Sequence, residues 1–197
     1  MGLLEKNSIL ASIHGSVGNL VVVHYKGRVW TRQKPTVTPK ATPRRKAHRG
    51  KLGRAAKWAR VLPEQAPEVA ARYRKAAEGT DWSWQNLAVA DYMHGPVIEE
   101  IDLSGYSGLS GERIRVQARD DVKPPMKLGV AEVRVVIRNL AGKALEQGQA
   151  GQDGAAWVYV TQTEVQPGQI VNIEVMATDQ PSNHVTKTVP HLTRSDA

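Results

Sequence analysis

From Val97 onward, the hydrophobic residues of this chain recur at every second position. Seven segments share the alternation: VIEEIDL (97–103), ERIRVQAR (112–119), VAEVRVVIRN (130–139), KALEQGQ (143–149), AAWVYVTQ (155–162), QIVNIEVMATD (169–179) and NHVTKTVP (183–190). Successive side chains of a β-strand point to opposite faces, so a period of two indicates strands with one apolar face. Seven short strands separated by turn-rich stretches predict a β-sandwich over residues 97–197.

The same alternation predicts which strand residues face the core. The inward sets are Ile114, Val116 and Ala118; Val133, Val135 and Ile137; and Val171, Ile173 and Val175. The stretch EVQPGQIVNIEVMATD (164–179) looks like the turn and penultimate strand of an immunoglobulin-like or fibronectin-like domain, so we expect an immunoglobulin-like sandwich. The chain has no cysteine, which excludes a disulfide framework, thiolate zinc sites and cysteine nucleophiles.

A β-hairpin is predicted near the N-terminus. The run Asn19–Tyr25 is rich in β-branched residues, Lys26-Gly27 supplies a turn, and Arg28–Gln33 continues in alternating order. The alternation places Arg28, Trp30 and Arg32 on one face. Because an isolated two-stranded hairpin is only marginally stable in water, we expect this one to pack on another element.

Residues 36–96 change to a helical pattern after an extended start. In TVTPKATPRR, Pro39 and Pro43 predict an extended strap. One apolar helical face then follows, made of Leu52, Ala55, Ala56, Ala59 and Leu62, and Pro63 is expected to end that helix.

Two further helices are expected in this part of the chain. One runs from about Pro67 to Glu78, with Gly79 as its C-terminal cap. The next runs from Trp82 to His94, with Asp81 as its N-cap. The apolar residues of these helices are mostly alanine, which predicts a thin core.

Together, these patterns predict an α+β fold. An N-terminal β-hairpin and a short helical module precede an all-β immunoglobulin-like sandwich. The expected domains are residues 1–35, the N-terminal segment and hairpin; 36–96, the basic strap and helices; and 97–197, the sandwich with a C-terminal tail.

Positive charge is concentrated in the first half of the chain. Thirteen Lys and Arg residues and no Asp or Glu lie between Lys26 and Arg60. Residues 1–95 carry 17 basic and 6 acidic side chains, a net charge of +11, whereas residues 96–197 carry 10 and 13, a net charge of −3. Such asymmetry predicts an anionic partner for the N-terminal part.

The candidate partner-binding residues are Arg28, Trp30, Arg32, Arg44, Arg45, Lys46, Arg49, Lys51 and Arg54. Two kinds of partner fit them. One is an acidic protein surface, on another subunit of an assembly or on a second copy of the chain. The other is the phosphate backbone of a nucleic acid, bound without sequence preference, since no base-reading motif accompanies the basic run.

No catalytic motif is present, and we expect a non-enzymatic protein without metal or cofactor. The chain lacks G-x-S-x-G, a Walker loop, HExxH and a G-x-G-x-x-G that follows a strand.

The Gly-rich SGYSGLSG (104–111) lies between two alternating segments, which predicts a hairpin loop. Glu99-Glu100 and Asp120-Asp121 are neighbours on strands, so the two members of each pair are expected on opposite faces and neither pair suits general acid–base catalysis. We expect them at solvated edges or as salt-bridge partners for the basic arm of another subunit. The N-terminus lacks a secretory signal pattern and no apolar run reaches a membrane span, so we expect synthesis in a cytoplasm and no membrane partner.

One combination of segments resembles a known group of proteins. GSVGNLVVVHYKGRVWTRQKP (15–35), followed by Thr42-Pro43, a basic run and helices with Ala and Trp58, is similar to a loosely defined group of small proteins. Many of them are encoded in phage and prophage-like clusters. The resemblance covers about residues 12–95, and the immunoglobulin-like tail resembles accessory domains of virion and tail proteins. It implies a capsid- or tail-associated structural component of a phage-like particle, made in the host cytoplasm and carried in the virion, with no catalytic residues.

Overall fold

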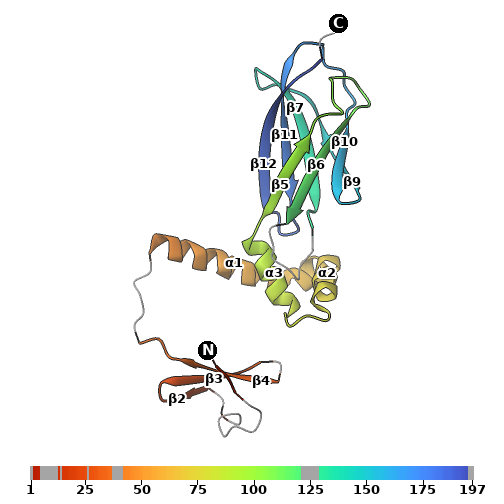
Figure 1. The fold of residues 1–197 in the computed structure, drawn as a ribbon. Coiled ribbons are helices and arrows are strands. Elements are labelled where there is room, and N and C mark those ends of the chain that lie inside the picture. The colour runs from red at the N-terminus through yellow and green to blue at the C-terminus, as the bar shows by residue number, and fades with distance from the viewer. Residues whose placement is uncertain are drawn as a thin grey trace. The chain divides into compact units, whose positions relative to one another are not determined.

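The computed structural model describes residues 2–4, 13, 15–25, 27–36, 42–120 and 129–194. The chain divides into two compact units, Met1–Arg49 and Gly50–Ala197, and each is described by itself. Figure 1 shows their helices and strands. The domain borders expected after residues 35 and 96 remain predictions.

The first unit contains an antiparallel four-stranded sheet. Its strands are β1 (Gly2–Leu4), β2 (Gly15–Val17), β3 (Leu20–Tyr25) and β4 (Arg28–Gln33), in the order β1-β4-β3-β2. The predicted hairpin is confirmed as β3 and β4, but it is not two-stranded, because β1 and β2 pair with its two edges. Val22 and Val29 are buried in the sheet. The turn residue Lys26 lies outside the described residues.

Helix α1 (Pro43–Gln65) shows that the extended strap is wrong from Pro43 onward. Thr42 caps the helix, since its Oγ1 accepts a hydrogen bond of 3.3 Å from the Arg45 N–H. Pro43 takes the first helical position, where a missing N–H removes no helical hydrogen bond and a φ near −65° suits the helix. Pro39 lies outside the described residues.

The expectation that Pro63 ends α1 is also wrong. Pro63 stands in the last turn, and the Ala66 N–H still donates to the Leu62 carbonyl at 2.8 Å. So close to the C-terminus, a proline removes one hydrogen bond without preventing the next, and the helix ends at Gln65, ahead of Pro67.

Helix α2 (Pro67–Ala77) begins where predicted, and Gly79 follows it with a φ of +70°. Helix α3 (Trp84–Met93) begins two residues later than expected. Ser83, not Asp81, is its N-cap, since the Ser83 Oγ accepts a hydrogen bond of 3.2 Å from the Asn86 N–H.

The predicted thin core of the helices is confirmed: its buried residues are Ala59, Leu62, Ala70, Tyr73, Leu87 and Ala88. Leu52, expected on the apolar face, is 43% exposed.

Two antiparallel sheets form a β-sandwich-like part, so the fold is mixed α+β (Figure 1). The first has the order β5-β6-β10-β9 and the second the order β12-β11-β7-β8. The strands are β5 (Pro96–Asp102), β6 (Arg113–Asp120), β7 (Glu132–Asn139), β8 (Ala144–Gln149), β9 (Gly151–Asp153), β10 (Ala156–Val160), β11 (Ile170–Thr178) and β12 (His184–Leu192). All seven predicted strands are present. Strand β9 was expected to be part of a turn, but it pairs with β10 around a turn at Gly154.

The two sheets share one hydrophobic core. It contains Ile114 and Val116 from the first sheet and, from the second, Val133, Val135, Ile137, Val171, Ile173 and Val175, all fully buried. These inward predictions are confirmed. Ala118 is half-buried against the same core.

Glu146 is a buried polar link between the two sheets. It belongs to β8, is 8% exposed, and its Oε1 accepts a hydrogen bond of 2.6 Å from the hydroxyl of Tyr159 on β10. The backbone N–H groups of Gln162 and Thr163 donate to the same carboxylate at 2.6 and 3.0 Å. The Glu146 carboxylate therefore accepts hydrogen bonds from a side chain of the opposite sheet and from the loop that follows it.

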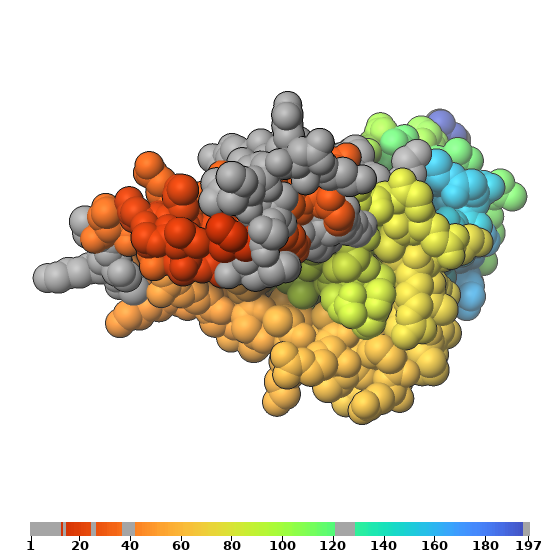
Figure 2. All heavy atoms as spheres, turned by 90° about the horizontal axis from the view of Figure 1, so that it is seen from below, coloured from red at the N-terminus to blue at the C-terminus, as the bar shows by residue number. Residues whose placement is uncertain are grey.

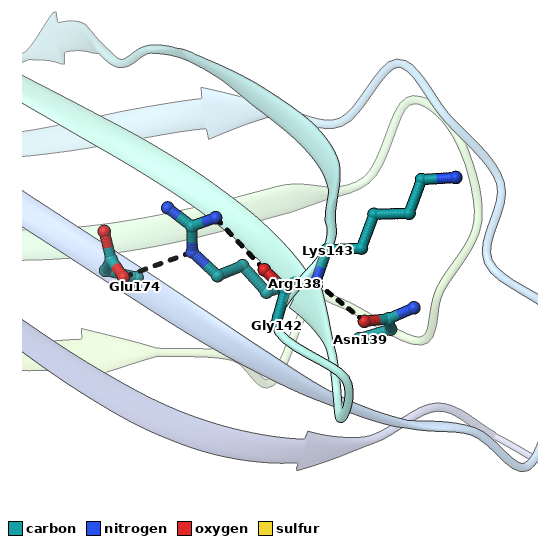
Figure 3. A network of polar contacts seen from close by, with 5 residues as sticks. All are labelled: Arg138, Asn139, Gly142, Lys143 and Glu174. Atoms are coloured by element: carbon teal, nitrogen blue, oxygen red, sulfur yellow. Dashed lines mark hydrogen bonds and ion pairs between the residues drawn. The ribbon is translucent and has the colours of Figure 1, made fainter.

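Arg138 links the inner strands β7 and β11 next to the β7–β8 turn, as Figure 3 shows. Its Nε lies 3.3 Å from Glu174 Oε2 on β11, and its Nη1 donates to the Gly142 carbonyl at 3.3 Å. In the same turn, the Lys143 N–H donates to Asn139 Oδ1 at 2.9 Å. These contacts fix the β7–β8 turn to the neighbouring strand.

The Gly-rich stretch 104–111 is confirmed as a loop between β5 and β6. The Glu112 carboxylate accepts hydrogen bonds from the N–H groups of Ser107, Gly108 and Leu109 at 2.7, 3.0 and 2.9 Å. Burial raises the pKa of Glu112, but the hydrogen bonds from Ser107, Leu109 and Gly108 outweigh it and lower the pKa overall. Three backbone N–H groups of this loop are therefore already hydrogen-bonded to the Glu112 carboxylate.

The prediction that Glu99 and Glu100 point to opposite faces of β5 is wrong, because the register shifts between Ile98 and Glu100 and both residues are exposed. Glu99 forms an ion pair with Arg119, and Glu100 accepts a hydrogen bond of 3.2 Å from Gln117. Across the described residues, no helix is long and apolar enough to cross a membrane.

Candidate functional site

The first candidate surface is the face of β4 that carries Arg28, Trp30 and Arg32, here called the hairpin face. Its residues pair with β3 in register, Arg32 opposite Val21 and Trp30 opposite Val23. Directly opposed residues of antiparallel strands share a face, so the predicted placement of the three side chains together is confirmed. Arg28 and Arg32 are exposed and Trp30 is half-buried.

The second candidate surface is the exposed side of α1. Its predicted residues Arg44, Arg45, Lys46, Arg49 and Arg54, here called the α1 cations, are all exposed. Figure 2 shows side chains of α1 (orange) at the molecular surface. Within the described part of the chain, none of the α1 cations forms an ion pair with a carboxylate.

Lys51 differs from the other predicted cations. It is half-buried, and its Nζ donates a hydrogen bond of 3.1 Å to the Met93 carbonyl at the end of α3. A side chain committed to this backbone group has less freedom to contact a partner. Its geometry therefore indicates that Lys51 attaches α1 to α3.

The start of α1 concentrates positive charge where the helix dipole opposes it. Arg44, Arg45 and Lys46 occupy the first turn, which has no acidic residue. The N-terminus of a helix carries a partial positive charge, so each cation there is unfavourable by about 0.3–1 kcal/mol at low salt. An anionic partner would relieve that repulsion.

A third feature, the aspartate cluster, is formed by Asp91, Asp120 and Asp179. Asp91 belongs to α3, Asp120 is the last residue of β6, and Asp179 directly follows β11. One carboxylate oxygen of each lies within 4.8 Å of the others. Asp91 is fully buried and Asp179 is 3% exposed.

The expectation that Asp120 lies at a solvated edge is wrong, and its neighbour Asp121 lies outside the described residues. Both of its carboxylate oxygens are buried and accept no hydrogen bond from the described residues. Asp120 has the same strand parity as Ile114, Val116 and Ala118, and Asp179 continues the inward series of Val171, Ile173, Val175 and Ala177. This shared parity is a sequence signal for burial of Asp120 and Asp179. Asp91 has a comparable signal, because it lies three and four residues after the buried Ala88 and Leu87 on α3.

Hydrogen bonds hold two members of the cluster in place. The Tyr73 hydroxyl donates to Asp91 Oδ2. The backbone N–H and the Nδ2 of Asn183 donate to the two oxygens of Asp179 at 2.6 and 2.8 Å. Asp91 Oδ1 remains buried without a hydrogen-bond partner among the described residues.

The cluster carries more negative charge than its surroundings neutralise. Burial, followed by the nearby Asp120 carboxylate, raises the pKa of Asp91 to about 8, although the Tyr73 hydrogen bond opposes the shift. Burial also raises the pKa of Asp179 to about 6, against the hydrogen bonds from Asn183. Burial and the Asp91 carboxylate raise the pKa of Tyr73. Such an environment favours a bound proton or cation over three free carboxylates.

Asn183 joins the helices to the sandwich beside this cluster. Its Nδ2 donates to the His94 carbonyl at 2.8 Å and lies 3.3 Å from the Tyr92 carbonyl, while also bonding Asp179. One amide thus links the end of α3 to the turn between β11 and β12.

Replacing Asn183 with Ala is therefore expected to lower the free energy of unfolding by about 1–3 kcal/mol, because the buried Asp179 carboxylate and the carbonyls of Tyr92 and His94 lose the Asn183 amide as a donor. Urea denaturation measures the loss, and hydrogen exchange should show faster opening at the end of α3. The matched control is Asn172→Ala on β11, whose side chain makes no such link, and it should lose less. Equal losses in the two variants would contradict the role of Asn183.

Comparisons with known proteins identify no family for this chain. No family model matches it, and no curated protein matches it. Among solved structures, CopC from Methylosinus trichosporium OB3b aligns with a TM-score of 0.35 and 13% identity, over 51% of this chain and 93% of CopC. An engineered protein aligns with a TM-score of 0.34 and 18% identity, over 51% of this chain and 20% of that one. Both likenesses are too remote to carry an argument about function.

Proposed function

We propose that this protein is a non-enzymatic structural component of a phage-like particle, associated with the capsid or tail. It docks through its basic N-terminal module onto an acidic surface of other subunits or of a second copy. The observation that carries the docking proposal is the set of exposed α1 cations, which form no ion pair within the described residues. The particle proposal rests on the resemblance of residues 12–95 to phage-encoded proteins.

Physical chemistry supports an anionic partner for this module. A group of exposed cations attracts a negatively charged surface, and at physiological salt this attraction extends over about 8 Å, the Debye length. The hairpin face adds Trp30 between Arg28 and Arg32, and Trp and Arg are the residue types enriched at binding hot spots. In this proposal, the α1 cations steer the encounter and the hairpin face contributes short-range contacts.

The sandwich is proposed to be immunoglobulin-like. In chain order, β5, β6 and β7 correspond to strands A, B and C, β8 to C′, and β9 to β12 to strands D to G. With these letters, the order of the first sheet is A-B-E-D and that of the second is G-F-C-C′. Constant-type immunoglobulin domains have strands A, B, E and D in one sheet and C, F and G in the other. Its role in the particle is to project from the docking site or to make lateral contacts.

The alternative is sequence-nonspecific nucleic-acid binding by the same residues. The observation that favours it is that the basic run is helical from Pro43, because the major groove of B-DNA admits an α-helix. The α1 cations would then contact phosphates and give a steep dependence of affinity on salt.

One binding experiment separates the two proposals. Fluorescence anisotropy with labelled duplex DNA and with polyglutamate, an acidic polypeptide, is measured at equal ionic strength, alongside sedimentation of the protein with the products of its neighbouring genes. The docking proposal expects co-sedimentation and no DNA affinity at about 0.15 M salt. DNA binding with a steep salt slope and no protein partner would overturn it in favour of the alternative.

A further inference from the structure

We propose that the aspartate cluster of Asp91, Asp120 and Asp179 binds a single Ca²⁺ ion, which ties helix α3 to the end of the β-sandwich. This site is separate from the α1 cations and the hairpin face, and it does not depend on the proposed docking function.

The donors suit a hard divalent cation. All three side chains offer carboxylate oxygens, the ligand type that Ca²⁺ and Mg²⁺ prefer, and the cluster contains neither His nor Cys. Two oxygens on opposite sides of a Ca²⁺ ion lie about 4.8 Å apart, which is twice the metal–oxygen distance. The oxygens of the cluster lie within 4.8 Å of one another, so all three can ligate one Ca²⁺ ion.

A second observation points independently to a ligand. Asp91 is fully buried, yet its Oδ1 accepts no hydrogen bond from the described residues, and neither do the two buried oxygens of Asp120. Buried polar atoms almost always have a hydrogen-bond partner, so these acceptors call for a positive or donating group. No described Lys or Arg side chain forms an ion pair with them.

The surrounding hydrogen bonds orient the donors before a cation binds. Tyr73 fixes the Asp91 carboxylate, and Asn183 fixes that of Asp179. Partners that hold ligands in this way raise metal affinity because the site needs little rearrangement. Ca²⁺ takes six to eight oxygens, so water molecules would complete its coordination.

The ion would couple two parts of the second unit. Asp91 lies on α3, whereas Asp120 ends β6 of one sheet and Asp179 directly follows β11 of the other. A cation bound by all three connects the helices and both sheets at one point. Since an unfolded chain does not form this site, Ca²⁺ is expected to stabilise the folded protein.

The test is thermal unfolding of the full chain near pH 7.5 after dialysis against EDTA, with and without CaCl₂, together with isothermal titration of CaCl₂. We expect Tm to rise by about 5–10 °C at a free Ca²⁺ concentration of about 100 times Kd. MgCl₂ at the same concentration should give a clearly smaller rise, and an equal rise would overturn the assignment to Ca²⁺.

Asp91→Asn and Asp120→Asn are the diagnostic variants. In EDTA, their Tm should equal or exceed that of the parent protein, because an amide removes like-charge repulsion from the cluster. With CaCl₂, neither should gain the rise. The control Asp153→Asn removes an exposed carboxylate elsewhere in the sandwich and should keep the full response. The same Tm in EDTA and CaCl₂ with no binding heat, or an undiminished rise in both Asn variants, would overturn the proposal.

Discussion

Replacement of Arg44, Arg45, Lys46 and Arg49 by Gln is expected to weaken binding to an anionic partner about a thousandfold at 0.15 M salt, if all four contact it. On duplex DNA, each lost phosphate contact lowers the slope of log affinity against log salt by about 0.9, so four lost contacts lower it by about 3.6. The fold should persist, because the four side chains are exposed and form no ion pair within the described residues. Gln is nearly as good a helix former as Arg and Lys, and the change removes positive charge from the unfavourable end of the helix.

The matched control carries four other substitutions to Gln, at exposed cations of the sandwich: Arg113, Arg134, Lys143 and Arg194. Both variants lower the net charge from +8 to +4, so only the location of the lost charge differs. Anisotropy with duplex DNA and with polyglutamate, over a range of salt, should show a large loss for the α1 variant and a small one for the control. If both lose affinity equally, net charge drives binding and α1 is not the docking element.

The sandwich could be predicted from the sequence because its signal is local. An alternation of apolar and polar residues directly encodes which face of a strand is buried. Residues such as Val171, Ile173 and Val175 therefore pointed to the core before their partners were known. Strand β9 was missed because Gly151–Asp153 is short and its composition is that of a turn.

The first turns of α1 could not be predicted in the same way. Between Pro43 and Gly50 every side chain is exposed, so no apolar face marks the helix by its period. The prolines then favoured an extended strap, although Pro43 is well suited to the first position of a helix. A capping Thr42 ahead of Pro43 was the better signal.

The aspartate cluster depends on tertiary structure. Its members lie on a helix, at the end of a strand of one sheet and directly after a strand of the other, and only the packing of these elements brings them together. Strand parity places Asp120 and Asp179 on inward-facing positions, but parity does not indicate that they lie beside each other or beside Asp91. Residue spacing can reveal a metal site within one helix or loop, but not one built from distant segments.

Glu146 offers the largest expected effect on the stability of the sandwich. Glu146→Ala is expected to lower the free energy of unfolding by about 3 kcal/mol, because the buried Tyr159 hydroxyl and two backbone N–H groups lose their acceptor. Glu146→Gln should lose less, about 1–2 kcal/mol, since a Gln Oε1 can still accept from Tyr159 and Gln162 while its amide faces the Thr163 N–H.

The free energy of unfolding of each variant is measured by urea denaturation, and a control shows how much stability is lost when an exposed Glu side chain is shortened to Ala. Glu132→Ala, at an exposed position of β7, is the control and should change stability by less than about 0.5 kcal/mol. Adding Tyr159→Phe to Glu146→Ala should recover part of the loss, because the second change removes the hydroxyl that the first leaves unpaired. A double variant less stable by the full sum of the single losses would contradict a direct link between Glu146 and Tyr159, since residues that share a hydrogen bond do not act additively. Recovery would show that this bond joins the two sheets in a chain that has no cysteine to form a disulfide between them.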